Sequence, residues 1–194
     1  SAPSETGKTT LTHLLVNSMD KLALSISYTT RPIRGTEQDG VNYHFIDKER
    51  FLAMIDADEF VEWAEVHGNY YGSSATWTKA SLESGRDVLF DIDVIGGMQI
   101  KKHYEDAVAI FITPPSFDEL EKRLLRRGTE SHDVIKKRLE AAKDEILVGL
   151  KNYDYVINNE KLDRALFDLT SIIRAHHIMR IDRDKIKNRL FSGS

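Results

Sequence analysis

The first nine residues constrain the fold of this chain more than any other segment. Residues 2–9 read Ala-Pro-Ser-Glu-Thr-Gly-Lys-Thr, which approximates the phosphate-binding loop pattern G-x-x-x-x-G-K-[ST]. In such a loop, successive backbone N–H groups converge on phosphate oxygens at the N-terminus of a helix. Leu11, Leu14 and Leu15 follow at helical spacing and predict a helix over residues 9–16. The alternative is a helix N-terminus rich in Ser and Thr that contains Gly-Lys by chance.

The loop interpretation assigns chemistry to two side chains. Lys8 would place a positive charge on the β- and γ-phosphates of a nucleotide, and Thr9 would offer a hydroxyl to Mg²⁺. Two residues depart from the pattern, because Ala2 replaces the first glycine and Glu5 brings a carboxylate into the loop. Such a loop normally follows a buried strand. We therefore expect that strand to be absent from the sequence, unless the loop interpretation is wrong.

The rest of the chain alternates strand-like and helix-like segments, which is typical of an α/β fold. The apolar runs at 87–92 and 107–112 are typical of strands buried on both faces of a parallel sheet. Other strands are predicted over 24–29, 41–45, 61–63, 70–71 and 155–157, with a hairpin turn at Gly68-Asn69. Helices are predicted over 47–55, with Phe51, Leu52 and Ile55 facing inward, and over 116–124, 135–146 and 166–173. The basic stretch 180–189 is expected to be a solvated helix or tail.

This pattern predicts one domain over residues 1–194. A P-loop parallel-sheet core, with helices on both faces, would be built from about 1–24 and 86–194, and a β-rich insertion from about 25–85. The net charge of −4 does not indicate a general nucleic-acid binder. No apolar stretch approaches the ~20 residues that cross a bilayer. The absence of cysteine excludes disulfides and thiolate chemistry and fits a reducing compartment. Together, these features lead us to expect a cytoplasmic protein without nucleic-acid or membrane partners.

Two carboxylates follow the predicted strand at 87–92. Asp91 and Asp93 lie where the carboxyl end of a parallel strand meets a ligand, and one of them could hold Mg²⁺ through water. The alternative is a polar strand end that caps the next turn. Glu62 lies in an apolar context within the insertion and needs a partner, for which a nucleobase N–H pair would be suitable. The scattered histidines do not have the spacing of metal ligands.

Arginines gather in two places. One group surrounds Gly128-Thr129 and another flanks Pro32-Ile33: these are Arg123, Arg126, Arg127 and Arg138, and Arg31 and Arg34. Guanidinium groups suit phosphoryl transfer, which demands the neutralisation of much negative charge. The alternative for each arginine is a solvated position on a helix or loop.

Taken in order, these segments resemble the motifs of the guanylate kinase family over nearly the whole chain. The matching segments are residues 1–9, 25–35 (Ser-Ile-Ser-Tyr-Thr-Thr-Arg-Pro-Ile-Arg-Gly), 60–64, 68–73, 91–93 and 122–130, with Arg138 beyond them. The resemblance implies a kinase that transfers a phosphoryl group from ATP to GMP with Mg²⁺. It also implies a helical lid over about 122–140. Ile95 stands where the family usually carries glutamine.

The resemblance also implies a role for each site residue. The GMP phosphate would be held by Ser27, Arg31, Arg34, Tyr43 and Tyr71, and the guanine by Glu62, Ser73 and Asp93. ATP would contact Ser4, Glu5, Thr6, Gly7, Lys8, Thr9 and Thr10, with Asn159 near the adenine and Mg²⁺ at Thr9 and Asp91. Catalysis would depend on Lys8, Arg31, Arg123, Arg127 and Arg138.

Two other functions compete with this one. A guanylate-kinase-like interaction module would bind peptides in the GMP site, but such modules lose catalytic elements that this chain retains, such as Lys8 and Thr9. A kinase for another nucleoside monophosphate is disfavoured by the pair Glu62 and Asp93. Guanine presents N1–H and N2–H₂ donors to carboxylates, whereas adenine has an acceptor at N1.

Overall fold

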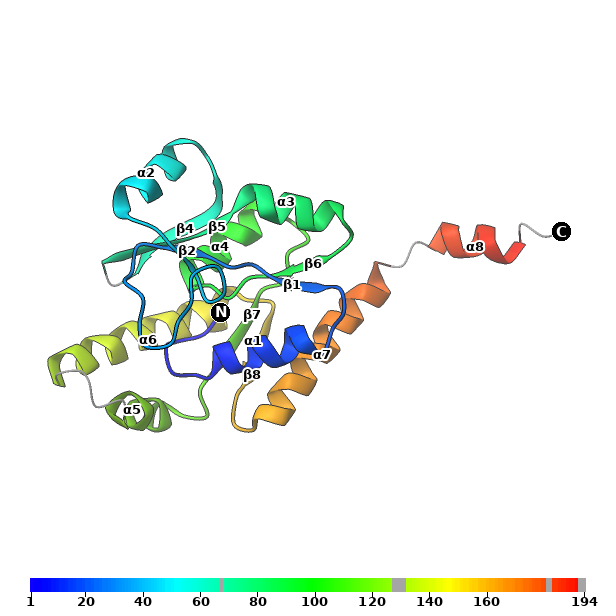
Figure 1. The fold of residues 1–194 in the computed structure, drawn as a ribbon. Helices are drawn as coiled ribbons and strands as arrows, with labels where there is room; N and C mark the ends of the chain where they lie inside the picture. The colour runs from blue at the N-terminus through cyan, green and yellow to red at the C-terminus, as the bar shows by residue number, and fades with distance from the viewer. Residues whose placement is uncertain (67, 127–131, 181–182, 192–194) are drawn as a thin grey trace.

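The computed structural model describes residues 1–66, 68–126, 132–180 and 183–191 (Figure 1). The first helix is α1 (Lys8–Asn17), which confirms the helix predicted after the glycine-lysine pair. Its N-cap is Gly7 with φ 89°, a left-handed conformation that glycine adopts without steric cost. The loop therefore turns sharply into the helix, as the sequence pattern requires.

The α/β core contains parallel strands in two separate pairs. β1 (Leu22–Leu24) pairs with β6 (Asp87–Leu89), and β7 (Ile110–Thr113) pairs with β8 (Tyr155–Asn158). The parallel arrangement that the buried apolar runs predicted is confirmed. β6 is shorter than the strand predicted over 87–92 and ends at Leu89.

An apolar slot of about 420 Å³ lies between these two pairs, lined by residues of both β6 and β7. Ser1 sits at its end and bonds to β7 as a neighbouring strand would. The Ser1 amine donates to the Ile110 carbonyl at 2.8 Å, and the Ile112 N–H donates to the Ser1 carbonyl at 2.8 Å. The slot is therefore bordered by strand edges that can accept one more strand.

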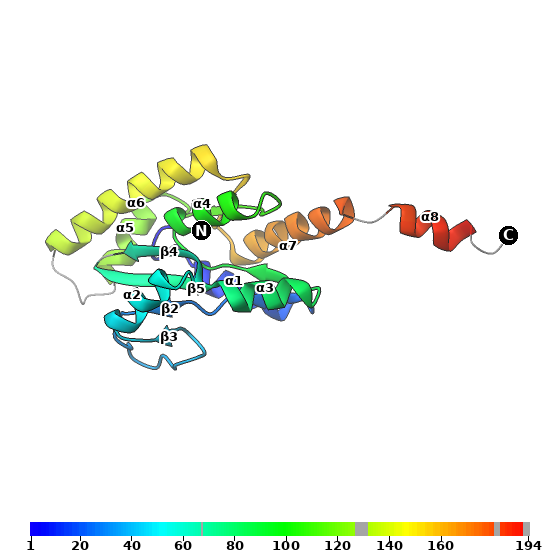
Figure 2. The same ribbon diagram turned by 90° about the horizontal axis from the view of Figure 1, so that it is seen from above.

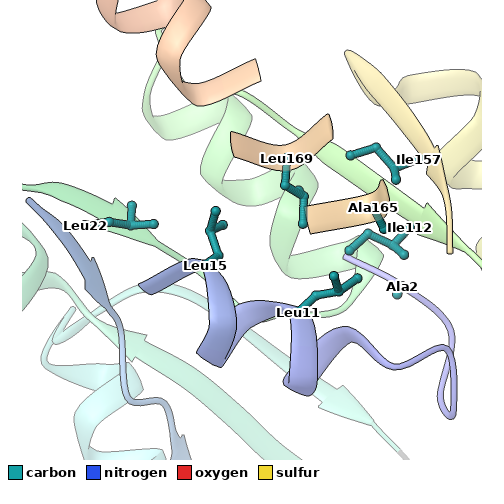
Figure 3. Close-up of a cluster of buried hydrophobic side chains, with 8 residues drawn as sticks. All are labelled: Ala2, Leu11, Leu15, Leu22, Ile112, Ile157, Ala165 and Leu169. Carbon is teal, nitrogen blue, oxygen red and sulfur yellow. The ribbon is translucent and has the colours of Figure 1, made fainter. Parts of the chain in front are cut away.

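Helices cover both faces of this core. Leu11 and Leu15 of α1 pack with Ala165 and Leu169 of α7 (Leu162–Met179) in one cluster that also contains Ile112 (Figure 3). The preceding residue of β7, Phe111, points to the opposite face, because side chains alternate along a strand. There Gly149 of α6 (His132–Asn152) packs so closely that an added Cβ would lie 2.4 Å from the Phe111 ring. This glycine sets the distance between α6 and the sheet.

The inserted region forms a second sheet with the order β3-β2-β5-β4. Its strands are β2 (Tyr28–Thr29), β3 (His44–Phe45), β4 (Phe60–Val66) and β5 (Asn69–Ser74). β4 and β5 pair antiparallel, so the predicted hairpin is confirmed. Its turn lies before the predicted position, because Gly68 has φ 76° and Asn69 already pairs with Val66. α2 (Lys48–Asp56) and α3 (Ala75–Glu83) flank this sheet, capped by the side chains of Asp47 and Ser74.

Three predictions for strands and helices of the insertion are wrong in detail. The strand predicted over 41–45 is reduced to β3, and Val41 is 56% exposed. Residues 24–29 do not form one strand, because β1 ends at Leu24 and β2 begins at Tyr28 in the other sheet. The alternation of apolar and small polar residues continues across this crossing, but the side chains that it buries are those of Ser25, Ser27 and Thr29. In α2 the buried residues are Phe51 and Met54, whereas Leu52 is 39% exposed.

The remaining helices are α4 (Val94–His103), α5 (Phe117–Arg126) and α8 (Arg183–Phe191). The basic C-terminal stretch is helical within α8, which extends away from the rest of the molecule in both views (Figures 1 and 2). Within the described ranges, the structure contains no helix long and apolar enough to cross a bilayer.

Candidate active site

A cleft of about 1170 Å³ separates the phosphate-binding loop from the inserted sheet, and α6 forms one of its walls. Most of the residues that the sequence singled out line it. From the loop and α1 these are Ser4, Glu5, Thr6, Gly7, Lys8, Thr9 and Thr10, and from the insertion Ser27, Arg31, Arg34, Tyr43, Glu62 and Tyr71. Asp91, Asp93 and Arg138 complete this set. The fold thus brings segments from both halves of the chain to one cavity.

Internal hydrogen bonds hold the loop in shape. The buried Thr6 hydroxyl donates to the Pro3 carbonyl at 2.6 Å, and the Asn159 amide donates to the Thr6 carbonyl at 2.8 Å. Asn159 lies so close beneath Gly7 that an added Cβ would meet its Nδ2 at 2.9 Å. The N-terminus of α1 therefore opens into the cleft with its backbone N–H groups available for an anion.

The two departures in the loop differ structurally. Ala2 is buried and does not have a positive φ, so alanine fits without strain. Glu5 has φ 63°, a left-handed conformation that costs a non-glycine residue about 1–2 kcal/mol. The departure at Glu5 therefore carries a conformational cost in addition to its charge.

Lys8 and Asp91 meet at the floor of the cleft. The Lys8 ammonium forms an ion pair with Asp91 and also donates to the Ile92 carbonyl at 3.1 Å. The Thr12 hydroxyl lies 3.5 Å from the second oxygen of Asp91. Thr9, in the first turn of α1, is exposed. A cation, a carboxylate and a hydroxyl are thus placed around the loop.

Glu62 is a buried acid at the side of the cleft formed by the inserted sheet. It is 3% exposed, and one oxygen accepts a hydrogen bond from the Ser73 hydroxyl at 2.6 Å. Burial raises its pKa to about 7, and the negative charge of Asp93 adds to this effect. Gly96 packs against the other oxygen, since an added Cβ would lie 2.4 Å from it.

Asp93 caps the helix that begins behind Glu62. One of its oxygens accepts hydrogen bonds from the N–H groups of Ile95 and Gly96 at 2.7 and 3.0 Å, at the N-terminus of α4. This is the alternative role that the sequence left open for Asp93. The same carboxylate also lines the cleft, so capping and ligand contact are compatible.

Arg31 is the most enclosed cation of the cleft, at 7% exposure. Its guanidinium lies 5.3 Å from the ring centre of Tyr43 and forms two hydrogen bonds with Glu37. These hydrogen bonds are the main reason why the pKa of Arg31 is raised. Burial raises the pKa of Tyr43, whose ring also meets that of Tyr71 edge to face at 5.9 Å. Aromatic rings and a carboxylate thus fix this guanidinium.

Arginines from α5 and α6 contact the loop itself. Arg138 donates to the Ser4 hydroxyl at 2.6 Å, and Arg123 lies 3.4 Å from the Glu5 carbonyl oxygen. Arg123 is also tied to Glu119 of its own helix. Arg127, the third arginine assigned to this group, lies outside the described residues.

Three predicted site residues are not among the described residues that line the cleft. Ser73 is fully buried behind Glu62, and Asn159 lies beneath the loop. Arg123 reaches the loop from α5. Among the described residues, no cluster of three or more acidic or histidine side chains is arranged to bind a metal.

Two acidic residues of the cleft were missed by the sequence analysis. Glu37 contacts both Arg31 and the backbone of Arg34, and its position six residues after Arg31 carried no recognisable signal. Glu145 lines the cleft on α6, seven residues after Arg138, so that helical periodicity could have placed both on one face. Burial raises the pKa of Glu145 to about 7, with a further contribution from Asp93.

Comparisons with known proteins agree with this geometry. A family model described as guanylate kinase matches residues 1–176. The guanylate kinase of Aromatoleum aromaticum is 50% identical over 178 residues, which is 91% of this chain and 86% of that protein. The guanylate kinase of Vibrio cholerae is 48% identical over 187 residues, 95% of this chain and 88% of that protein. A crystal structure of guanylate kinase from Anaplasma phagocytophilum superposes with a TM-score of 0.74 at 32% identity, over 87% of this chain and 81% of that one.

Proposed function

This chain belongs to the guanylate kinase family, and we propose that it transfers the γ-phosphoryl group of ATP to GMP, giving ADP and GDP. One observation carries the assignment to this cleft. A phosphate-binding helix N-terminus with Lys8 and a buried carboxylate, Glu62, line the same cavity. The helix N-terminus with Lys8 suits a nucleoside triphosphate, and the carboxylate of Glu62 suits a base with N–H donors.

On the ATP side, the chain's own groups stabilise charge. The backbone N–H groups of residues 4–10 and the Lys8 ammonium would hold the phosphates, and Arg138 would replace its contact with Ser4 by one to the transferring group. Arg123 would contribute from α5. Phosphoryl transfer has a transition state in which little covalent chemistry falls to the protein, so positioning and charge dominate the rate.

Mg²⁺ fits the donor set beside the loop. A hydroxyl, that of Thr9, and a carboxylate, that of Asp91, are oxygen ligands of the kind this ion prefers, and Asp91 would act directly or through water. When bound, the ion neutralises charge on the β- and γ-phosphate oxygens. Asp91 has a further role of its own, because it orients Lys8 through their ion pair.

On the GMP side, Glu62 and Asp93 would read the guanine, and Arg31, Arg34, Tyr43 and Tyr71 would hold its phosphate. Ser73 donates to one oxygen of Glu62 and so orients the carboxylate toward the base. Adenine would place an acceptor where guanine has the N1–H donor. A buried acid left without that donor costs binding free energy, which gives discrimination between the two bases.

A coupled assay of ADP formation tests this proposal. GMP, AMP, CMP and UMP are supplied in turn as acceptors with ATP and Mg²⁺, and we expect turnover with GMP to exceed the others by orders of magnitude. Lys8→Met serves as the catalytic control, and its kcat should fall far more than its KM because the charge acts on the transferring phosphates.

The outcomes separate the competing functions. Turnover with another monophosphate at a rate equal to that with GMP would indicate a kinase of different specificity. Binding of GMP without any turnover would indicate an interaction module. Wild-type kcat in Lys8→Met would overturn the assignment of the loop.

A further inference from the structure

Glu37 and Arg31 form an ion pair that contains two hydrogen bonds. Nη1 of Arg31 donates to Oε2 of Glu37 at 3.0 Å, and Nη2 donates to Oε1 at 2.7 Å. Each nitrogen of the fork therefore meets its own carboxylate oxygen, which is the bidentate arrangement that fixes the guanidinium plane. Arg31 is 7% exposed and the Glu37 side chain 24%, so the arginine end of the pair is the better shielded from water.

Glu37 is itself fixed by the loop that connects β2 to β3. Its Oε2 accepts the backbone N–H of Arg34 at 2.8 Å, and its own N–H donates to the Arg34 carbonyl at 3.0 Å. Arg31 and the Arg34 hydrogen bond lower the pKa of Glu37, so the carboxylate is charged at neutral pH. The Arg34 backbone thus fixes the Glu37 carboxylate, which in turn fixes the Arg31 guanidinium.

The donor count shows which part of Arg31 remains for a ligand. A guanidinium has five N–H donors. Glu37 takes one from each terminal nitrogen, and the Pro32 carbonyl accepts from Nη1 at 2.7 Å. The Tyr71 hydroxyl also interacts with the guanidinium. The donors that Glu37 and Pro32 leave, on Nε and Nη2, share one edge of the guanidinium. An edge of that kind can bind two oxygens of a phosphate at once.

The packing around Arg31 leaves this orientation little freedom. The guanidinium lies 5.3 Å from the ring centre of Tyr43 and 5.8 Å from that of Phe45. These rings limit movement out of the guanidinium plane, whereas Glu37 sets the rotation within it. Without the acid, the fork could turn in its plane while keeping both aromatic contacts.

We propose that Glu37 is a positioning residue for GMP: it turns the Nε/Nη2 edge of Arg31 toward the nucleotide phosphate. This inference rests on the proposed function and deepens its phosphate site. The opposite role would be that the carboxylate occupies the place of the phosphate and competes with it. The hydrogen bonds between Glu37 and the Arg34 backbone favour the positioning role, because they fix the carboxylate within the loop. A carboxylate fixed in this way is not readily displaced by a phosphate.

The test compares GMP with guanosine, which has the same base but no phosphate. Glu37→Gln keeps the shape of the side chain but loses the charge and one acceptor. By calorimetry, its Kd for GMP should rise by about 10- to 100-fold, as expected for the loss of a charged, partly buried hydrogen-bond pair. Its Kd for guanosine and its KM for ATP should not change, and kcat should fall less than the KM for GMP rises.

Two further variants complete the design. Glu37→Asp keeps the charge but is too short to reach both terminal nitrogens, so it should show the same selective loss. Glu65→Gln is the matched control, because it removes one negative charge from an exposed position on β4 that does not line the cleft. Its Kd for GMP should equal that of the wild type.

Each outcome decides the inference. Unchanged or tighter GMP binding in Glu37→Gln would overturn it, and tighter binding would identify the carboxylate as a competitor of the phosphate. Equal losses for GMP and guanosine in both Glu37 variants would also overturn it, since the residue would then only maintain the fold. If the wild type bound no GMP, the proposed function itself would fail, which is a distinguishable result.

Discussion

At the scale of single residues, Glu62 shows how the cleft prepares a buried acid for its ligand. Burial favours the protonated carboxyl group, and its pKa rises to about 7. The folded protein therefore binds a proton more tightly than the unfolded chain. The resulting contribution to stability is complete below the ordinary carboxyl pKa and is lost as the pH rises through about 7.

We expect GMP binding to release a proton from Glu62. The N–H donors of guanine favour the charged carboxylate, so its pKa should fall when the base binds. Calorimetric titrations with GMP near pH 7, in buffers with different ionisation enthalpies, measure this release. The GMP phosphate also titrates in this range. The readout is therefore the difference between wild type and Glu62→Gln, and identical proton release in both would contradict the prediction.

Glu5→Gly should both stabilise the protein and improve ATP binding. Glycine adopts the observed φ of 63° without the ~1–2 kcal/mol cost that glutamate incurs there. Removing a carboxylate from the phosphate loop should also lower the KM for ATP by up to about tenfold, or ~1.4 kcal/mol. Thermal unfolding and steady-state kinetics measure the two effects, and the KM for GMP should barely move.

Asp58→Gly is the matched control for the strain at Glu5. Asp58 also has a positive φ, 53°, but does not line the cleft. Its replacement should raise Tm and leave the KM for ATP unchanged. Weaker ATP binding in Glu5→Gly would mean that this carboxylate assists the nucleotide.

At the scale of helices and strands, the sequence allowed most of the core to be predicted, because apolar periodicity reports burial directly. The helix after Gly7 and the hairpin at Gly68 were recognisable from local chemistry alone. The split between β1 and β2 was not, since the alternating pattern is the same in two different sheets. Glu62 could be singled out as an acid among apolar residues, whereas the role of Glu37 depends on how its loop folds back.

An extended apolar segment joined before Ser1 should occupy the slot between β6 and β7. The slot is bordered by strand edges and apolar side chains, and Ser1 lies at its end. A segment of ~5 β-branched residues should pair with both edges. Because each buried aliphatic side chain contributes about 1.5–3 kcal/mol, Tm should rise by at least ~5 °C. A glycine-serine extension of equal length is the control, and equal Tm values would contradict the prediction.

At the scale of the whole molecule, the predicted lid over about 122–140 includes the end of α5 and the first part of α6. Residues 127–131 of the predicted lid lie outside the described part of the chain. On either side of them, Arg123 and Arg138 reach the phosphate loop. These contacts join the lid segment to the loop that would hold ATP.

We expect ligands that fill both ends of the cleft to close the molecule. Phosphoryl transfer requires the exclusion of water, and the arginines must follow the transferring group. Small-angle scattering with a two-substrate analogue should give a smaller radius of gyration than the free protein, whereas GMP alone should give a smaller change. An unchanged radius at saturation would rule out a closing lid.

The central claim is that this cleft transfers a phosphoryl group from ATP to GMP. It is tested most directly by following the group itself. ATP labelled with ³²P at the γ-position is incubated with GMP and Mg²⁺, and the nucleotides are separated. The account predicts that the label appears in GDP, with one ADP formed for each GDP, and that Lys8→Met forms almost none. Label that remained in ATP, or that appeared only as free phosphate, would contradict it.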